Sequence, residues 1–237
     1  MKKHAPIRGW PDLAGLVEKQ FKRGWIYRGV GRSNNRIYTL RPRIGRPGRR
    51  KSAASGVVLP YNQDDEKKLL ATFQVEARRF DWHPAHPLEW MILGQHHLLS
   101  TRLLDWTESL LVAAFFAVED PLDPSPGIYG IEPPPPIGDL SVDPFDSDLL
   151  GDAPLLVRPP HISSRITVQK AVMTLHPKPT KTWAPDEMHF WPIKPGGTAF
   201  TLKGKLNFCG INGASLFPDS ADRHTQSLDW RHKWGRL

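Results

Sequence analysis

The sequence predicts an α+β fold in a single domain, and three observations favour this class. Helical and extended patterns both occur but do not alternate regularly, which argues against a doubly wound parallel sheet. The chain has 237 residues, enough to bury one large core. Hydrophobic residues make up 39% and charged residues 24%, as in globular rather than disordered proteins. We therefore treat residues 1–237 as one domain with helices surrounding a sheet.

The clearest predicted helix covers residues 62–80. It opens with asparagine and acidic residues and carries Leu69, Leu70, Phe73 and Ala77 on one face. Further helices are expected at 11–21, at 87–96, at 107–118 with Thr107 as N-cap, at 198–208 before Gly210, and at 219–234.

Extended segments are expected at 25–29, 127–132, 155–158 and 166–175, where β-branched and aromatic residues gather. Residues 31–60 contain many glycines, prolines and basic residues, so we expect a long loop there. Residues 181–194 have no regular pattern and are expected to be irregular.

Charge is divided unevenly along the chain. Its net charge is +8, but residues 1–51 hold fifteen Lys and Arg against Asp12 and Glu18, whereas 103–157 hold eleven acids and no basic residue. This predicts a basic N-terminal arm within 1–60 and an acidic, proline-rich insertion at about 120–155. The arm either is a solvated surface or binds an acidic macromolecule such as RNA or DNA. The residues expected to make that contact are Arg41, Arg43, Arg46, Arg49, Arg50 and Lys51.

The lone cysteine, Cys209, cannot form a disulfide within the chain. The sequence contains no run of about 18 apolar residues, so no membrane span is expected. A reducing, cytoplasmic setting is the simplest interpretation.

The segment QHHLLSTRLLDW (95–106) gathers polar side chains directly before an apolar run. The neighbouring His96 and His97 point in different directions on a helix or a strand, so we expect no metal site. Two alternatives remain for the rest of the segment. Arg102 and Asp105 form a structural ion pair, or Thr101 and Arg102 contact a ligand with Asp105 and Trp106 behind them.

Two further positions carry potential chemistry. Arg28 and Gly29 end a predicted strand, where the guanidinium can bind a phosphate or carboxylate and the glycine permits close approach of a ligand. The alternative is a surface arginine beside a turn. Gln169 is a polar residue within the apolar stretch 165–175, and it either faces solvent or belongs to a site.

These motifs together resemble the FRG domain family, which is named for a (Phe/Tyr)-Arg-Gly sequence. The resemblance rests on Tyr27-Arg28-Gly29, the Leu-x-Pro-x-Ile at 40–44, the long segment 95–119, RITVQKAVMTL at 165–175 and GINGASLFPD at 210–219. It extends from about residue 24 to residue 219.

The order of these motifs is similar to that of the ADP-ribosyltransferases, which clamp NAD in a split β-sheet. The resemblance implies NAD as substrate, with Arg28, Thr101, Arg102 and Gln169 as catalytic residues. The residues that it implies for NAD binding are Tyr27, Arg28, Gly29, Ser100, Thr101, Asp105 and Trp106. Gln169 stands where those enzymes carry a glutamate, so Asp105 or Glu108 is an alternative source of the negative charge.

The resemblance therefore implies an NAD-dependent ADP-ribosyltransferase, a bacterial toxin or anti-phage effector that modifies nucleic acid or protein. A neutralising antitoxin is a possible partner. Two other classes stay open. One is a non-catalytic nucleic-acid-binding module, and the other is a nuclease or hydrolase with His96 or His97 as general base.

Overall fold

The computed structural model describes residues 1–237 except 34–39, 49–54, 80–83, 162 and 234–237. In this part of the chain, one open sheet has seven strands in the order β1-β7-β4-β2-β3-β6-β5. These strands are β1 (Lys2–Lys3), β2 (Ile26–Val30), β3 (Leu103–Thr107), β4 (Gly127–Ile131), β5 (Leu155–Val157), β6 (Ala171–Leu175) and β7 (His189–Pro192). β1 lies parallel to β7, and the other neighbours are antiparallel.

Nine α-helices accompany the sheet within the described residues, together with two short 3₁₀ turns. The helices are α1 (Trp10–Gln20), α3 (Gln63–Glu76), α4 (Pro87–His96), α5 (Leu110–Ala117), α6 (Ser147–Leu150), α7 (Ser164–Val168), α8 (Gly197–Phe208), α9 (Gly213–Leu216) and α10 (Ala221–Lys233). The 3₁₀ turns are η1 (Arg43–Gly45) and η2 (Ala77–Arg79). One mainly antiparallel sheet with helices around it agrees with the predicted α+β class. No helix in the described ranges is both long and apolar enough to cross a bilayer.

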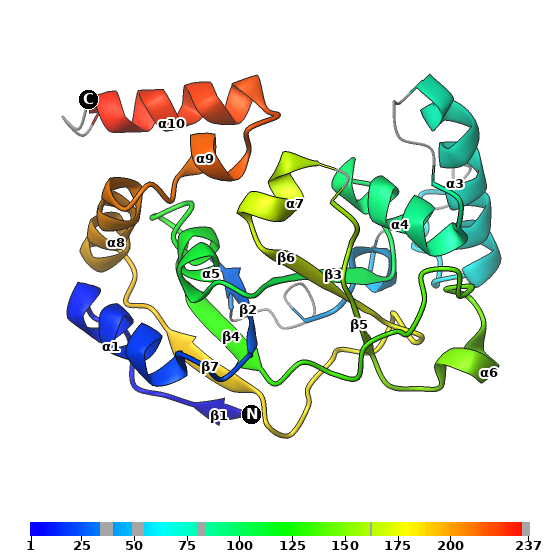
Figure 1. Ribbon diagram of the computed structural model, residues 1–237, viewed down its shortest axis with the longest axis horizontal. Coiled ribbons are helices and arrows are strands. Elements are labelled where there is room, and N and C mark those ends of the chain that lie inside the picture. Colours follow the sequence, from blue (N-terminus) through cyan, green and yellow to red (C-terminus); the bar gives the residue numbers. More distant parts are fainter. Residues whose placement is uncertain (34–39, 49–54, 80–83, 162, 234–237) are drawn as a thin grey trace.

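Two groups of helices pack on different halves of the sheet (Figure 1). α1, α5 and α8 share one apolar cluster with Tyr27 of β2 and Ile128 of β4. α3 and α4 share another with Leu103 of β3 and Leu175 of β6. Tyr27 pairs with Thr107, and side chains alternate along a strand, so Tyr27 and Leu103 project from the same face. The two helix groups therefore stand side by side over one face of the sheet.

The sheet parts between these groups. β2 and β3 are joined at one pair of residues, Tyr27 with Thr107, whereas β2 has five pairs with β4 and β3 has five with β6. Beyond Tyr27 the two strands diverge, and the strand pairing of β2 with β3 extends no further along β2. The sheet is therefore open at its centre, between β2 and β3.

Three predictions around the sheet are wrong. The helix expected at 107–118 begins at Leu110 with Ser109 as its N-cap, and Thr107 instead ends strand β3. The Thr107 hydroxyl accepts a hydrogen bond from the Ser109 N–H at 2.9 Å and donates to the Gln169 carbonyl at 2.7 Å, so it joins two elements. The stretch 166–175 divides into α7 and β6, and residues 181–194, expected to be irregular, contain β7.

Candidate functional site

A cleft of about 1010 Å³ opens where β2 and β3 part. Residues 27–32 and 103–107 line it without interruption. Because consecutive residues of a strand face opposite sides of the sheet, the cleft receives side chains from both faces and runs into the gap between the strands. Segments from α4, α5, α7 and α10 complete its walls.

Arg28 bridges the gap. Its Nη1 donates a hydrogen bond to the main-chain oxygen of Asp105 on β3, in the place where a regular sheet would have a backbone N–H. Burial lowers the pKa of Arg28, and the negative charge of Asp105 opposes this shift. An arginine stays protonated at neutral pH even so. The parted sheet therefore holds a cation between its two central strands.

Gly29 is fixed by packing against a helix. A Cβ atom at this position would lie 1.7 Å from the carbonyl oxygen of Ala113 and 2.7 Å from the backbone nitrogen of Ala117. Helix α5 thus rests directly on the β2 backbone. This contact explains the glycine of the Tyr-Arg-Gly motif without any ligand, although Gly29 also lines the cleft.

Asp105 is exposed on a strand whose other residues are buried, and it lines the cleft. A chain of hydrogen bonds orients its carboxylate. The backbone N–H of Leu103 donates to the Thr101 hydroxyl at 3.1 Å, and that hydroxyl donates to Gln95 Oε1 at 2.6 Å. The amide nitrogen of Gln95 then faces Asp105 and donates to Oδ2 at 3.1 Å. Thr101 is therefore a positioning residue that acts through Gln95.

Thr101 and Ser100 lie outside the cleft lining, and a ligand contact of either residue stays a prediction. Thr101 is buried, with 2% of its surface exposed, and its hydroxyl is committed to the backbone and to Gln95. The site is reached instead by the amide of Gln95, a residue that the sequence analysis did not single out.

Arg102 points away from the cleft, and the structure corrects both expectations for it. It is 1% exposed and forms an ion pair with Glu66 at 2.9 Å rather than with Asp105. Its guanidinium also donates to the main-chain oxygen of Pro144 at 3.0 Å and lies 4.5 Å from the ring centroid of Phe145. Arg102 thus ties β3 to α3 and to the acidic insertion.

Gln169 follows α7 as its C-cap and is not on a strand, contrary to expectation. Its side chain lines the cleft, and Nε2 donates to the main-chain oxygen of Leu216 at 2.7 Å. Gln169 therefore also anchors the C-terminal segment to the cleft wall.

Behind the cleft lies a buried polar chain. Trp106 Nε1 donates to the Thr174 hydroxyl at 3.1 Å, and that oxygen lies 2.9 Å from His176 Nε2. The ring of Trp183 meets both Trp106 and His176 edge-on. Burial, with a smaller effect of Arg28, lowers the pKa of His176 to about 3. His176 is thus a neutral part of the wall.

This pKa predicts an acid-sensitive fold. Folded His176 stays neutral down to about pH 3, whereas in the unfolded chain it binds a proton near its usual pKa of 6.5. Stability is therefore lost as the pH falls from 6.5 towards 3, by roughly 1.4 kcal/mol per pH unit for this residue. Between pH 6.5 and pH 5, we expect the free energy of unfolding of the His176→Gln variant to fall by roughly 2 kcal/mol less than that of the parent protein. Urea unfolding at both pH values measures it, and an unchanged loss in the variant would contradict the assignment.

Some of the other residues expected at the site line the cleft, and others do not. Arg43 and Arg46 line the cleft, while half-buried Arg41 lies outside its lining and donates to the Thr182 hydroxyl at 3.1 Å. Residues 49–51, which include the expected contacts Arg49, Arg50 and Lys51, lie outside the described residues. Glu108 forms a surface ion pair with Arg158 at 2.6 Å and does not line the cleft.

The rings of His96 and His97 meet edge to face, with an interplanar angle of 90° and centroids 5.1 Å apart. His96 lines the cleft and His97 does not. Burial and the charge of Arg165 lower the pKa of His96, so its ring is neutral near pH 7. Within the described residues, no three side chains of the metal-binding types come together as a ligand set.

Several charged residues of the cleft were missed by sequence reasoning. They are Arg32, Glu119, Asp120, Asp123, Arg165 and Arg223. Three of them could have been found only from their positions in the sequence. Arg165 begins the stretch 165–175, and Glu119 and Asp120 end the apolar run.

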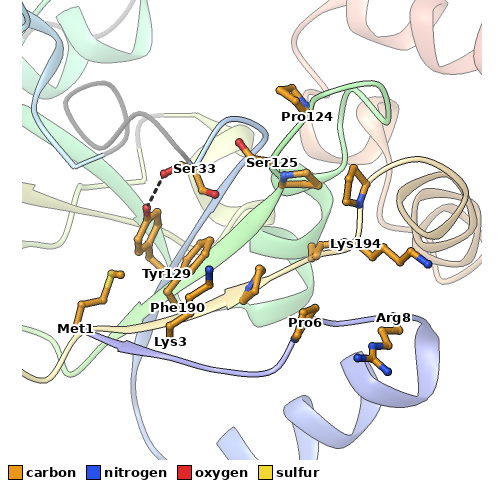
Figure 2. Close-up of a pocket in the computed structure, with 14 residues that line it drawn as sticks. Met1, Lys3, Pro6, Arg8, Ser33, Pro124, Ser125, Tyr129, Phe190 and Lys194 are labelled. Atoms are coloured by element: carbon orange, nitrogen blue, oxygen red, sulfur yellow. Dashed lines mark hydrogen bonds between the residues drawn. The ribbon is translucent and has the colours of Figure 1, made fainter.

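A second hollow, of about 780 Å³, lies beside β4 and β7. Figure 2 shows the rings of Tyr129 and Phe190 at one end of it and Arg8 and Lys194 at the other. The Tyr129 hydroxyl donates to the Ser33 carbonyl at 3.3 Å. Prolines supply much of the remaining lining, and no carboxylate faces a cation there. The cleft between β2 and β3 is therefore the candidate site.

Comparison with known proteins finds one family model, which covers part of the candidate site. The family model of the FRG domain matches residues 23–125. This segment carries Arg28, Gly29 and Asp105, but it ends before Gln169 and before the motif at 210–219. No curated protein and no solved structure matches the chain.

Proposed function

We propose, starting from the FRG domain match of residues 23–125, that this chain transfers ADP-ribose from NAD to a macromolecule. In this reaction the bond between the nicotinamide nitrogen and ribose C1′ breaks, and nicotinamide leaves with the electron pair. An acceptor oxygen or nitrogen bonds to C1′ and loses a proton. One observation carries the proposal: the parting of the sheet brings Arg28 and Asp105 into one cleft.

The roles follow from charge and geometry. Arg28 is a cation at the bottom of the cleft, and its planar guanidinium can hold β3 and bind a phosphate oxygen at the same time. The Asp105 carboxylate is held by Gln95 and can stabilise the positive charge that develops on the ribose. This arrangement supports Asp105 as the source of the negative charge that the Gln169 side chain does not carry. The Gln169 side-chain oxygen can accept a hydrogen bond from a ribose hydroxyl.

The basic residues at the cleft support an acidic acceptor, with RNA or DNA as the leading candidates. Arg43 and Arg46 bring part of the basic arm to the cleft. Guanidinium groups there would attract a phosphate backbone towards the reacting carbon. A role as a toxin or anti-phage effector, with a neutralising antitoxin, stays a prediction from the family resemblance.

The test follows nicotinamide release from NAD in the presence of RNA, DNA and a protein extract, with label transfer as the second readout. We expect Arg28→Ala and Asp105→Asn to reduce both by roughly a hundredfold or more, since each removes a charge that acts in the transition state. Glu108→Gln is the matched control and should keep full activity, because Glu108 lies outside the cleft.

Two results would contradict the proposal. One is an absence of nicotinamide release and of label transfer with every acceptor. The other is nucleic-acid cleavage without NAD that is lost in His96→Ala, which would favour the hydrolase class.

A further inference from the structure

One arginine of the cleft stands apart from the others. The described arginines that line the cleft are Arg28, Arg32, Arg43, Arg46, Arg165 and Arg223. Five of them hold a protein partner. Arg28, Arg43 and Arg46 donate to main-chain oxygens, while Arg32 and Arg223 pair with Asp123 and Glu119. The Arg165 side chain has no hydrogen bond or ion pair to any residue that the structure describes, and its guanidinium carbon lies 4.7 Å from the ring centroid of Phe217.

The surroundings of Arg165 make its charge costly. The residue is half-buried, and burial lowers its pKa. Arg223 adds a second cation, because its guanidinium carbon lies 4.2 Å from the centroid of the same Phe217 ring. Water cannot fully solvate a half-buried guanidinium, and like charges repel, so an anion that bound both groups would stabilise this pair.

The nearby carboxylates of Asp105, Asp219 and Glu119 raise the pKa of Arg165, but none of them forms an ion pair with it, and each has another partner. Asp219 accepts a hydrogen bond from the Ser164 hydroxyl at 2.7 Å, and Asp105 accepts one from Gln95 at 3.1 Å. Glu119 is paired with Arg223, and the two side chains are about equally exposed, at 32% and 33%. A half-exposed pair of this kind is weak and can be exchanged for a stronger one.

We propose that Arg165 and Arg223 form a phosphate-binding subsite of the cleft, and that Glu119 occupies the place of the phosphate on Arg223 when no ligand is bound. A guanidinium stacked on an aromatic ring directs its N–H groups outward along its edges, where phosphate oxygens bind two at a time. A phosphate offers enough oxygens for both guanidinium groups, whereas Glu119 reaches one of them.

The proposal rests on the proposed function only for the source of the phosphate. That source is the pyrophosphate of NAD, or alternatively the backbone of a nucleic-acid acceptor. Both present the same oxygens to the arginines, so binding of each kind of ligand separates them.

The experiment measures binding of ADP, of inorganic pyrophosphate and of a single-stranded oligonucleotide by isothermal titration calorimetry. We expect Arg165→Ala and Arg223→Ala to weaken ADP and pyrophosphate about tenfold or more, and Arg165→Lys to restore part of the loss. Arg158→Ala is the matched control, since it removes the same charge outside the cleft and should bind as the parent does. Glu119→Gln should tighten binding several-fold, and a misfolded variant could not produce that gain.

Several outcomes decide the matter. If Arg165→Ala binds ADP, pyrophosphate and the oligonucleotide all as the parent does, or Glu119→Gln weakens binding, the subsite is wrong even where NAD is cleaved. If NAD is not cleaved but pyrophosphate binds through Arg165, the proposed function fails and the subsite stands. A loss of affinity that is confined to the oligonucleotide assigns the subsite to the acceptor, and a loss confined to ADP and pyrophosphate assigns it to NAD.

Discussion

Arg102→Ala is expected to lower the free energy of unfolding by about 3–5 kcal/mol, because it leaves Glu66 as an unpaired buried charge. Glu66 is 3% exposed, so water cannot replace the guanidinium. The substitution also leaves the main-chain oxygen of Pro144 without its donor. Urea unfolding monitored by tryptophan fluorescence measures the change.

The control for this prediction is Arg158→Ala. Arg158 also pairs with a glutamate, Glu108, but its side chain is 60% exposed, so the loss should stay below about 1 kcal/mol. A cycle with Glu66→Ala separates the charge effect from packing. The double variant should be clearly more stable than the sum of the two single losses predicts, because removing both partners leaves no unpaired charge. Additive losses would show that the ion pair is not what holds Arg102.

Gly29→Ala is expected to destabilise the fold by about 3 kcal/mol or more, through a clash with helix α5. The added Cβ would lie 1.7 Å from the carbonyl oxygen of Ala113, and backbone atoms of a helix cannot rotate away as a side chain can. α5 would have to move off β2, which would separate the apolar cluster that it shares with α1 and α8. The shift in the thermal unfolding midpoint reports this loss.

Gly15→Ala is the matched control for this substitution. Gly15 lies in α1, and an added Cβ there would meet nothing within 4 Å. Because alanine favours a helix over glycine, this variant should be stabilised by up to about 1 kcal/mol. The same change of residue should thus have opposite signs at the two positions. A small effect at Gly29 would mean that the motif glycine serves a ligand rather than the packing of α5.

Sequence patterns predicted the helices best where the helix and its cap coincided. The asparagine before 63–76 accepts a hydrogen bond from the backbone of Asp64, and the proline at 87 begins α4 as expected. β3 was missed because Thr107 and Ser109 both resemble an N-cap. Only the tertiary contact of the Thr107 hydroxyl with Gln169 decides between them.

The site was predictable only in part, because its geometry depends on contacts between distant residues. Arg28 and Asp105, which the sequence singled out separately, both line the cleft. The local sequence does not indicate that Arg102 pairs with Glu66, because Glu66 lies 36 positions earlier. Arg165 and Arg223 converge through Phe217, and this convergence requires the path of the chain between α7 and α10.

The limited pairing of β2 with β3 indicates which part of this protein can fold as a unit. Both strands lie within 23–125, the segment that the family model matches, yet a single residue pair joins them. Their full partners, β4 and β6, begin at Gly127 and Ala171, beyond the end of that segment. The segment alone would therefore present two strands with unpaired edges. The C-terminal half supplies the partners that bring the two strands of the motif into one sheet, so the cleft requires both halves of the chain to be folded together.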